Sequence, residues 1–276
     1  MKLVYIGDIF GKPGRMVVQR LLGEIVQHYG ADVCIANCEN AAGGAGVTPA
    51  IIDELLKSGI NVLTSGNHVW DKKEVFECIS HETRLLRPAN YPEDVPGRGS
   101  HVVVAPDGTR IGVLNLMGRV FMSTVDCPFR KADEEIERLR PQCEVIFVDM
   151  HAEATSEKIA MGWYLDGRVS AVVGSHTHVQ TADERILPRG TAYITDVGMT
   201  GPYDSVIGIQ KEIVIEKFLS QMPKRFEAAK KDAVLAGVVV TVELSTGRAT
   251  NIRRLLIPLL NGREPDLESA SLASLA

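Results

Sequence analysis

The chain has 276 residues, with 30 Lys and Arg against 35 Asp and Glu, so its formal net charge is −5. Hydrophobic residues make up 45% and charged residues 24%, which is typical of a folded globular protein and excludes a wholly disordered chain. Scattered charge with a mildly acidic balance lacks the basic face of a duplex nucleic-acid binder, so we expect no duplex DNA partner. No apolar run approaches the roughly 18 residues of a membrane span, so we expect no membrane partner either.

Cysteine usage and the N-terminus both favour a cytoplasmic location. The five cysteines are odd in number and form no CxxC pair, which suits reduced thiols better than a disulfide framework. The first residues, 1–8, form a short apolar run that ends in a carboxylate, without the features of a signal peptide. We therefore interpret this run as a first strand.

The first third of the chain alternates strand-like and helix-like segments. We expect strands at Leu3–Ile6, Val33–Ala36 and Asn61–Thr64. A loop with Gly11, Pro13 and Gly14 precedes an amphipathic helix at Arg15–Tyr29, and Thr48-Pro49 begins a second helix that Gly59 ends. This alternation predicts parallel strands joined by crossover helices.

The rest of the chain predicts hairpins mixed with further strands. His101–Ala105 and Arg110–Leu116 flank a Pro-Asp-Gly turn, and a second hairpin pairs Gly237–Leu244 with Thr250–Ile257. Between the hairpins we expect a charged helix at Ala132–Arg140 and strands at Val145–Val148, Ala171–Val173 and Ala192–Thr195. The absence of a linker or repeat predicts a single mixed α/β domain over residues 1–266, followed by a flexible tail at 267–276.

Ligand-type side chains cluster just past the predicted strands. The set comprises Asp8, Glu39, Asn40, Asn67, His68, His151, His176 and His178. The carboxyl ends of parallel strands meet at one crevice of an open α/β sheet, so these groups are expected to lie together. Carboxylates, amides and imidazoles in this number exceed the needs of one tetrahedral zinc ion and suit two adjacent divalent ions. Nitrogen and oxygen ligands without thiolate favour Fe or Mn, with Zn or Co as alternatives.

The histidines, Asp8 and Asn67 also have ordinary structural explanations. A single histidine is more often a satisfied core residue than a ligand, Asp8 could cap a turn, and Asn67 could occupy a left-handed backbone conformation after Gly66. The coincidence of four histidines at strand ends, while His28, His81 and His101 lie elsewhere, favours the metal interpretation.

Several short blocks of sequence make the pattern more specific. Gly7-Asp8, Gly66-Asn67-His68 and Gly174-Ser175-His176-Thr177-His178 resemble the GD, GNH and GHxH blocks of calcineurin-like metallophosphoesterases. Longer strings, such as residues 38–44, 66–71, 86–92 and 195–208, are similar to the bacterial YmdB-type branch. The wider superfamily has an Asp-x-His pair in its first block, but here Phe10 stands in place of that histidine, two residues after Asp8. Glu39 stands where the superfamily has a bridging Asp. The YmdB-type branch shares both departures.

The resemblance implies a four-layer α/β/β/α sandwich of two mixed sheets flanked by helices. It implies that Asp8, Glu39, Asn40 and His178 hold one metal ion, and that Glu39, Asn67, His151 and His176 hold the other. The implied reaction is hydrolysis of a phosphodiester by a metal-bridging hydroxide, with a 2′,3′-cyclic nucleotide as the small substrate. Alternatives are a phosphomonoesterase acting on nucleotides or phosphoproteins, and a regulatory scaffold with structural metals. A homo-oligomer is left open.

His68 is expected to be the general acid. It neighbours a ligand without being one, and an imidazole with a pKa near ~6.5 is partly protonated at neutral pH. The alternative is that His68 only stabilises its turn.

Weaker candidates surround the predicted site. The glycine-rich loop 43–46 could cradle phosphate or simply form a flexible rim, and Cys38 is expected to be a packed thiol. Trp70, Tyr164 and Tyr203 could stack on a base but are more often packing residues. The candidate phosphate contacts are Arg98, Arg119 and Arg130.

Overall fold

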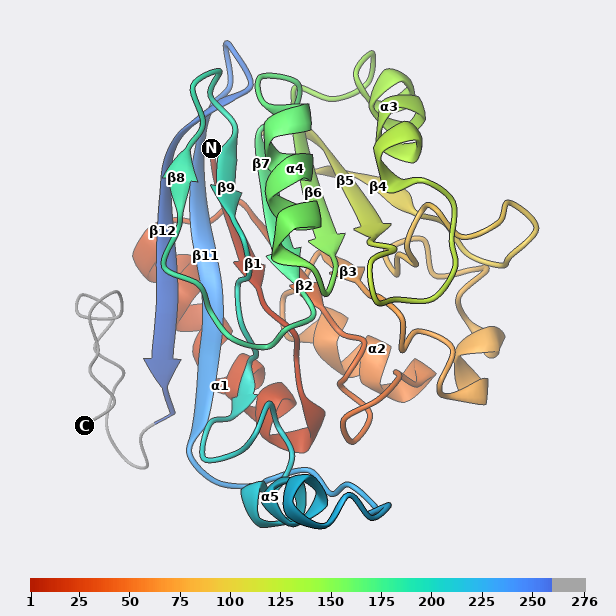
Figure 1. Cartoon of the computed structure of the whole chain (residues 1–276). Coiled ribbons are helices and arrows are strands. Elements are labelled where there is room, and N and C mark those ends of the chain that lie inside the picture. The colour runs from red at the N-terminus through yellow and green to blue at the C-terminus, as the bar shows by residue number, and fades with distance from the viewer. Residues whose placement is uncertain (260–276) are drawn as a thin grey trace.

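The structure is a computed structural model and describes residues 1–259. Two six-stranded mixed sheets lie face to face, with helices on their outer sides (Figure 1). The predicted tail at 267–276, and the end of the predicted domain at residue 266, lie outside the described residues. Within residues 1–259, no helix is both long enough and apolar enough to cross a membrane.

The first sheet has the order β10-β11-β1-β2-β3, with β12 paired to β11. Strands β1, β2 and β3 run parallel, as the alternation of strands and helices predicted, while β11 pairs antiparallel with β1 and forms a hairpin with β12. The bounds are Lys2–Ile6 (β1), Val33–Asn37 (β2), Val62–Thr64 (β3), Gly201–Pro202 (β10), Ala233–Glu243 (β11) and Arg248–Pro258 (β12).

The second sheet has the order β4-β5-β6-β7-β9-β8. Its central strands β5, β6, β7 and β9 run parallel, while β4 and β8 pair antiparallel at the two edges. The bounds are Ser100–Val104 (β4), Arg110–Met117 (β5), Val145–His151 (β6), Ala171–Ser175 (β7), Arg185–Ile186 (β8) and Ala192–Ile194 (β9). Both predicted hairpins are therefore confirmed.

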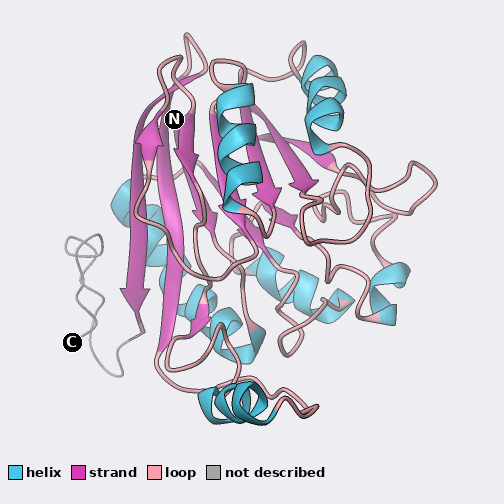
Figure 2. Ribbon diagram, in the orientation of Figure 1, coloured by secondary structure: helices cyan, strands magenta, loops and turns pink. Residues whose placement is uncertain are grey.

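Five α-helices and one short 3-10 helix complete the described chain. They are α1 (Gly11–Tyr29), α2 (Pro49–Lys57), the 3-10 helix η1 (Lys73–Glu77), α3 (Pro128–Leu139), α4 (Thr155–Leu165) and α5 (Lys211–Ser220). Figure 2 shows α3 and α4 on the outer face of the second sheet, while α5 lies at one end of the molecule.

Three apolar clusters separate four layers, which confirms the predicted α/β/β/α sandwich. One cluster joins α1 and α2 to the first sheet, one lies between the sheets, and one joins the second sheet to α3 and α4. The alternation of a strand explains this division, because successive side chains point to opposite faces. In β1, Leu3 and Tyr5 face the second sheet while Val4 and Ile6 face α1.

Two predicted boundaries near the site are wrong. Helix α1 begins at Gly11 rather than Arg15. Pro13 fits its first turn, where the backbone N–H groups have no intrahelical partner, and a Cβ on Gly14 would lie 2.3 Å from the Thr200 carbonyl oxygen. Strand β6 continues to His151, beyond the predicted end at Val148.

Two helices have no counterpart in the sequence prediction. Helix α4 buries Lys158 and places Gly162 against the ring of Tyr193, where a Cβ would lie 2.4 Å away, so its apolar pattern is interrupted. Helix α5 buries only Val214 and exposes Phe218 and Leu219, so it has no buried stripe to recognise.

Candidate metal centre

The predicted ligands come from the carboxyl ends of strands in both sheets. Asp8 and Glu39 lie two residues beyond β1 and β2, and Asn67 lies three residues beyond β3. His151 is the last residue of β6, while His176 and His178 follow β7. Each of the seven predicted ligand side chains lies within 4.0 Å of another member of the set.

Four of these side chains surround one point near the end of β6. His151 Nε2 lies 3.0 Å from Glu39 Oε1, 3.0 Å from Asn67 Oδ1 and 3.1 Å from His176 Nδ1. Ligands at right angles around an ion, each roughly 2.1 Å from it, are separated by about 3 Å. The spacing of this group therefore fits the ligand shell of a single divalent ion.

The remaining ligands form a looser group beside the first. His178 Nε2 lies 3.3 Å from Asn40 Oδ1 and 4.0 Å from Asp8 Oδ1. The same Asp8 oxygen lies 4.0 Å from His151 Nδ1, which links the two groups. The spacing in this second group is wider than the 3.0–3.1 Å of the first.

Two buried oxygens support the presence of cations. Asp8 Oδ1 and Glu39 Oε1 are the only buried carboxylate oxygens in residues 1–259 that accept no hydrogen bond. Burying a carboxylate without a hydrogen-bond or cationic partner is costly, so such oxygens normally coordinate a metal or pair with a cation. The donor set therefore fits divalent ions.

The pKa values of the buried site residues are shifted by burial and by each other's charges. Burial raises the pKa of Asp8 to about 6, although the imidazoles of His178 and His151 oppose this shift. Burial would also raise the pKa of Glu39, but the charges of His151 and His68 outweigh it and lower that pKa to about 2. For His151, burial favours the neutral ring, yet Glu39 and Asp8 raise its pKa to about 9. The His151 ring thus lies beside two buried carboxylates, and the rise in its pKa reflects the negative charge that they concentrate at this point.

His176 responds in the opposite direction. Burial and the adjacent charge of His151 lower the pKa of His176 to about 3. A neutral imidazole is the form that binds metals, so His176 is ready to act as a ligand. Its Nε2 atom lies 3.0 Å from Glu153 Oε2, a carboxylate that orients the ring.

His68 lies beside the cluster, as its predicted role requires. Its backbone N–H donates to Glu39 Oε2 at 2.9 Å, and its ring Nδ1 donates to Asp71 Oδ2 at 2.8 Å. The side chain is 37% exposed. Asp71 therefore occupies Nδ1, and no side chain within residues 1–259 forms a hydrogen bond with Nε2.

A buried polar network behind His151 escaped the sequence analysis. Ser175 Oγ lies 2.9 Å from His151 Nδ1 and donates to Asp149 Oδ1 at 2.7 Å. Tyr5 and Thr64 donate to the other oxygen of Asp149 at 2.6 Å and 2.5 Å. Burial raises the pKa of Asp149. A polar residue inside the apolar run of β6 was the available signal, and the network fixes the orientation of the His151 ring.

A buried ion pair shapes the turn that carries His176 and His178. Lys158 Nζ lies 2.7 Å from Asp196 Oδ2, and both side chains are almost completely buried. The same oxygen accepts hydrogen bonds from the backbone and hydroxyl of Thr177. His176 and His178 have φ angles of 98° and 63°, a left-handed conformation that is costly for residues other than glycine. The ion pair therefore holds a strained turn at the site.

Gly66 is required by the close approach of its backbone to His151. A Cβ at this position would lie 2.1 Å from Cδ2 and 2.2 Å from Nε2 of that ring. Asn67 does not have a positive φ, so the left-handed explanation for this residue is wrong. The glycine of the Gly-Asn-His block thus allows Asn67 to reach the imidazole.

Of the weaker candidates, several are explained by packing. Trp70 stacks on Phe76 and contacts the edge of Tyr91. The hydroxyl of Tyr164 donates to Asp133 on α3. Cys38 is fully buried, as predicted, and burial raises the pKa of its thiol.

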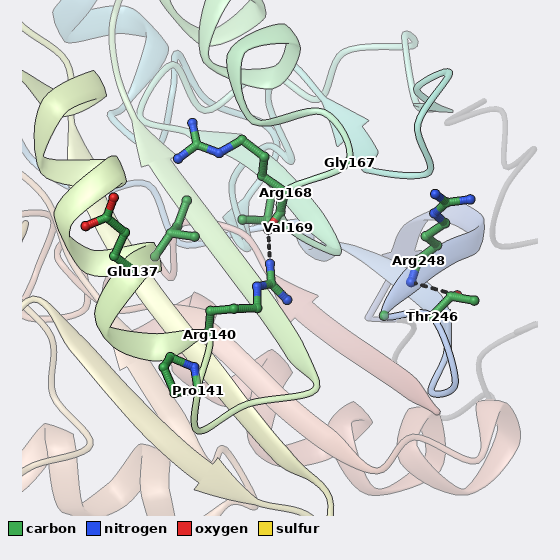
Figure 3. Close-up of a pocket in the computed structure, with 10 residues that line it drawn as sticks. Glu137, Arg140, Pro141, Gly167, Arg168, Val169, Thr246 and Arg248 are labelled. Carbon is green, nitrogen blue, oxygen red and sulfur yellow. Dashed lines mark hydrogen bonds between the residues drawn. The ribbon is translucent and has the colours of Figure 1, made fainter.

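Two cavities in the described part of the chain are lined by none of the predicted metal ligands. One, of about 550 Å³, lies between the end of α3, the start of β7 and the β11–β12 turn, at the opposite end of the strands (Figure 3). There Arg140 donates to the backbone carbonyl of Arg168. A second cavity, of about 650 Å³, is lined by Arg119, Arg130 and Lys131 together with an equal number of acidic residues, so it has no net positive charge.

Two mixed sheets with ligand-type side chains at the ends of their strands have the architecture of a metallophosphoesterase. Comparison with known proteins agrees: the model of the YmdB-like protein family matches residues 4–255. The chain is 50% identical over 257 residues to the 2′,3′-cyclic-nucleotide 2′-phosphodiesterase of Bacillus subtilis, covering 93% of this chain and 97% of that one. The chain belongs to the YmdB-like family.

Solved structures show the same relationship. A crystal structure of a phosphatase from Mycoplasma pneumoniae superposes with a TM-score of 0.88 at 36% identity, covering 94% of this chain and 93% of that chain. A Thermus thermophilus protein superposes with a TM-score of 0.87 at 40% identity, covering 94% and 99%. The layers and strand order described above are therefore those of the family.

Proposed function

We propose that the chain is a metal-dependent phosphodiesterase that hydrolyses 2′,3′-cyclic nucleotides. The observation that carries this proposal is the pair of buried carboxylate oxygens without hydrogen-bond partners, on Asp8 and Glu39, inside a set of amide and imidazole ligands. The cyclic nucleotide comes from the name of the Bacillus subtilis relative at 50% identity.

In this proposal, seven side chains would hold two divalent ions. Glu39, Asn67, His151 and His176 would hold one, and Asp8, Asn40 and His178, again with Glu39, would hold the other. Fe or Mn suits these ligands best, with Zn or Co as alternatives. When bound, such ions supply Lewis-acid polarisation of the phosphoryl group and lower the pKa of water.

The chain's own groups complete the reaction. Burial of the two carboxylates keeps the ligands fixed, while His68 stands at the exposed edge of the cluster where a leaving oxygen can reach it. Asp71 accepts the hydrogen bond from Nδ1, so Nε2 can deliver a proton to that oxygen. The oxygen of a water molecule forms a bond to phosphorus and loses a proton to solvent, and the bond from phosphorus to the 2′-oxygen breaks. The proton from His68 goes to that oxygen and yields the free 2′-hydroxyl of a 3′-nucleotide, after which solvent reprotonates His68.

A substrate panel tests the proposal. The purified, metal-loaded protein is assayed with 2′,3′-cyclic AMP, bis-p-nitrophenyl phosphate and p-nitrophenyl phosphate, and the product of the first is identified by chromatography. We expect turnover of both diesters and formation of 3′-AMP. A strong preference for the monoester would instead support a phosphomonoesterase, and no hydrolysis with any ion would support a scaffold with structural metals. The cytoplasmic location and the lack of a duplex DNA partner stay predictions.

A further inference from the structure

Phe121 is the most exposed large apolar side chain in residues 1–259, at 91% exposure. Its backbone has a φ of 61°, a left-handed conformation that is a genuine outlier for a bulky residue. Backbone strain opposes folding stability, and strained residues concentrate at functional sites. The position therefore calls for an explanation outside packing.

The loop that carries Phe121, residues 118–127, is firmly attached at its base. The Asn90 side chain donates to the carbonyls of Met117 and Asp126 at 2.7 Å and 2.9 Å, which joins the two ends of the loop. The buried Glu157 carboxylate accepts the backbone N–H groups of Arg119 and Val120. The left-handed residue is thus held in place by its neighbours.

This loop borders the metal centre on the side of β6. The backbone N–H of Gly118 donates to the carbonyl of His151 at 2.9 Å. Met122 Sδ accepts a hydrogen bond from the backbone of Glu153 at 3.3 Å, and the Glu153 carboxylate lies 3.0 Å from His176 Nε2. Phe121 is therefore adjacent in sequence to Met122. Met122 contacts Glu153, whose carboxylate lies beside the predicted ligand His176.

We infer that Phe121 is a stacking platform for the base of the nucleotide substrate. The inference rests on the proposed function and adds the contact that selects nucleotides over other cyclic phosphodiesters. Both faces of an exposed ring are accessible, whereas the Trp70 ring is already packed between Phe76 and Tyr91. Stacking on an aromatic ring tolerates any base, so the contact recognises a nucleobase without choosing among bases.

The test compares a nucleotide with a cyclic phosphodiester that has no base. Wild type, Phe121→Gly, Phe121→Trp and the neighbouring control Val120→Ala are assayed with 2′,3′-cyclic AMP and with glycerol 1,2-cyclic phosphate. Binding of 3′-AMP and of ribose 3-phosphate is measured in parallel by calorimetry. For Phe121→Gly we expect KM for 2′,3′-cyclic AMP and Kd for 3′-AMP to rise about 10-fold or more. The KM for glycerol 1,2-cyclic phosphate and the Kd for ribose 3-phosphate should be unchanged in Phe121→Gly. Phe121→Trp and Val120→Ala should resemble wild type with every ligand.

Thermal unfolding separates this role from a structural one. Glycine adopts positive φ without steric cost, so the Tm of Phe121→Gly should be unchanged or higher. Equal losses on both substrates, or no loss on the nucleotide, would overturn the stacking role alone. A wild-type protein that hydrolyses neither substrate would overturn the proposed function as well.

Discussion

Gly66→Ala places a methyl group against the ring of His151. The added Cβ would lie 2.1 Å from the ring Cδ2 and 2.5 Å from Cγ, whereas ordinary contact begins near 3.4 Å. Ring and backbone must therefore separate by about 1 Å. The ring is fully buried and has Ser175 Oγ 2.9 Å from its Nδ1, so it has little space in which to yield.

Two consequences follow from this displacement. Overpacking of a buried site costs about 1–3 kcal/mol of unfolding free energy. Because an error of about 1 Å in a catalytic group can cost about 100-fold in rate, we also expect phosphodiester turnover to fall on the order of 100-fold. Metal affinity should fall too, because His151 Nε2 moves relative to Glu39 and Asn67.

The matched control is the same substitution at Gly23. This glycine lies on the exposed side of α1, and a Cβ there meets nothing within 4 Å. Gly23→Ala should stabilise the helix by roughly 0.5–1 kcal/mol and leave the metal centre unchanged. Urea unfolding, metal titration and turnover are measured for both variants. Wild-type metal affinity and turnover in Gly66→Ala would refute the argument that this close approach positions the ligands.

Two further substitutions test the acid and the buried ion pair. His68→Ala should retain its metals while turnover falls on the order of 10²–10⁴-fold, because the leaving oxygen loses its proton donor. Metal analysis and steady-state kinetics check this expectation. Normal turnover would show that His68 is not the general acid. Lys158→Met should lower the unfolding free energy by about 3–5 kcal/mol, because it leaves the Asp196 carboxylate buried without its cation. The control Lys57→Met removes an exposed ion pair with Asp53 and should lower the unfolding free energy by less than about 1 kcal/mol. Urea unfolding measures both variants, and equal losses of unfolding free energy would contradict the importance of burial.

The four layers were implied by the family resemblance, whereas the strands, helix α1 and the hairpins were predicted from local patterns. Leu3–Ile6 is a short apolar run, α1 has apolar residues at helical spacing, and the hairpin turns have residues suited to them. Helix α4 was missed because it buries Lys158 and contains Gly162, both of which serve contacts made by distant segments. Such features depend on the tertiary fold and leave little local pattern.

The predicted site shows the same division. Ligand-type side chains at strand ends could be found in sequence because the topology of parallel strands brings those ends together. The supporting network of Asp149, Ser175 and Tyr5 was missed, since its members lie inside strands and Tyr5 reaches Asp149 only across the two sheets. Phe121 was missed for a related reason: exposure and a positive φ are properties of the folded loop.

The most direct test of the central claim is the number of metal ions per chain, measured by mass spectrometry on the wild-type and Glu39→Gln proteins. Because Glu39 is proposed as a ligand of both ions, the amide should lower occupancy at both positions. We predict two ions per wild-type chain, and fewer than one, with loss of phosphodiester hydrolysis, in Glu39→Gln. Two tightly bound ions in the Glu39→Gln protein would contradict the account.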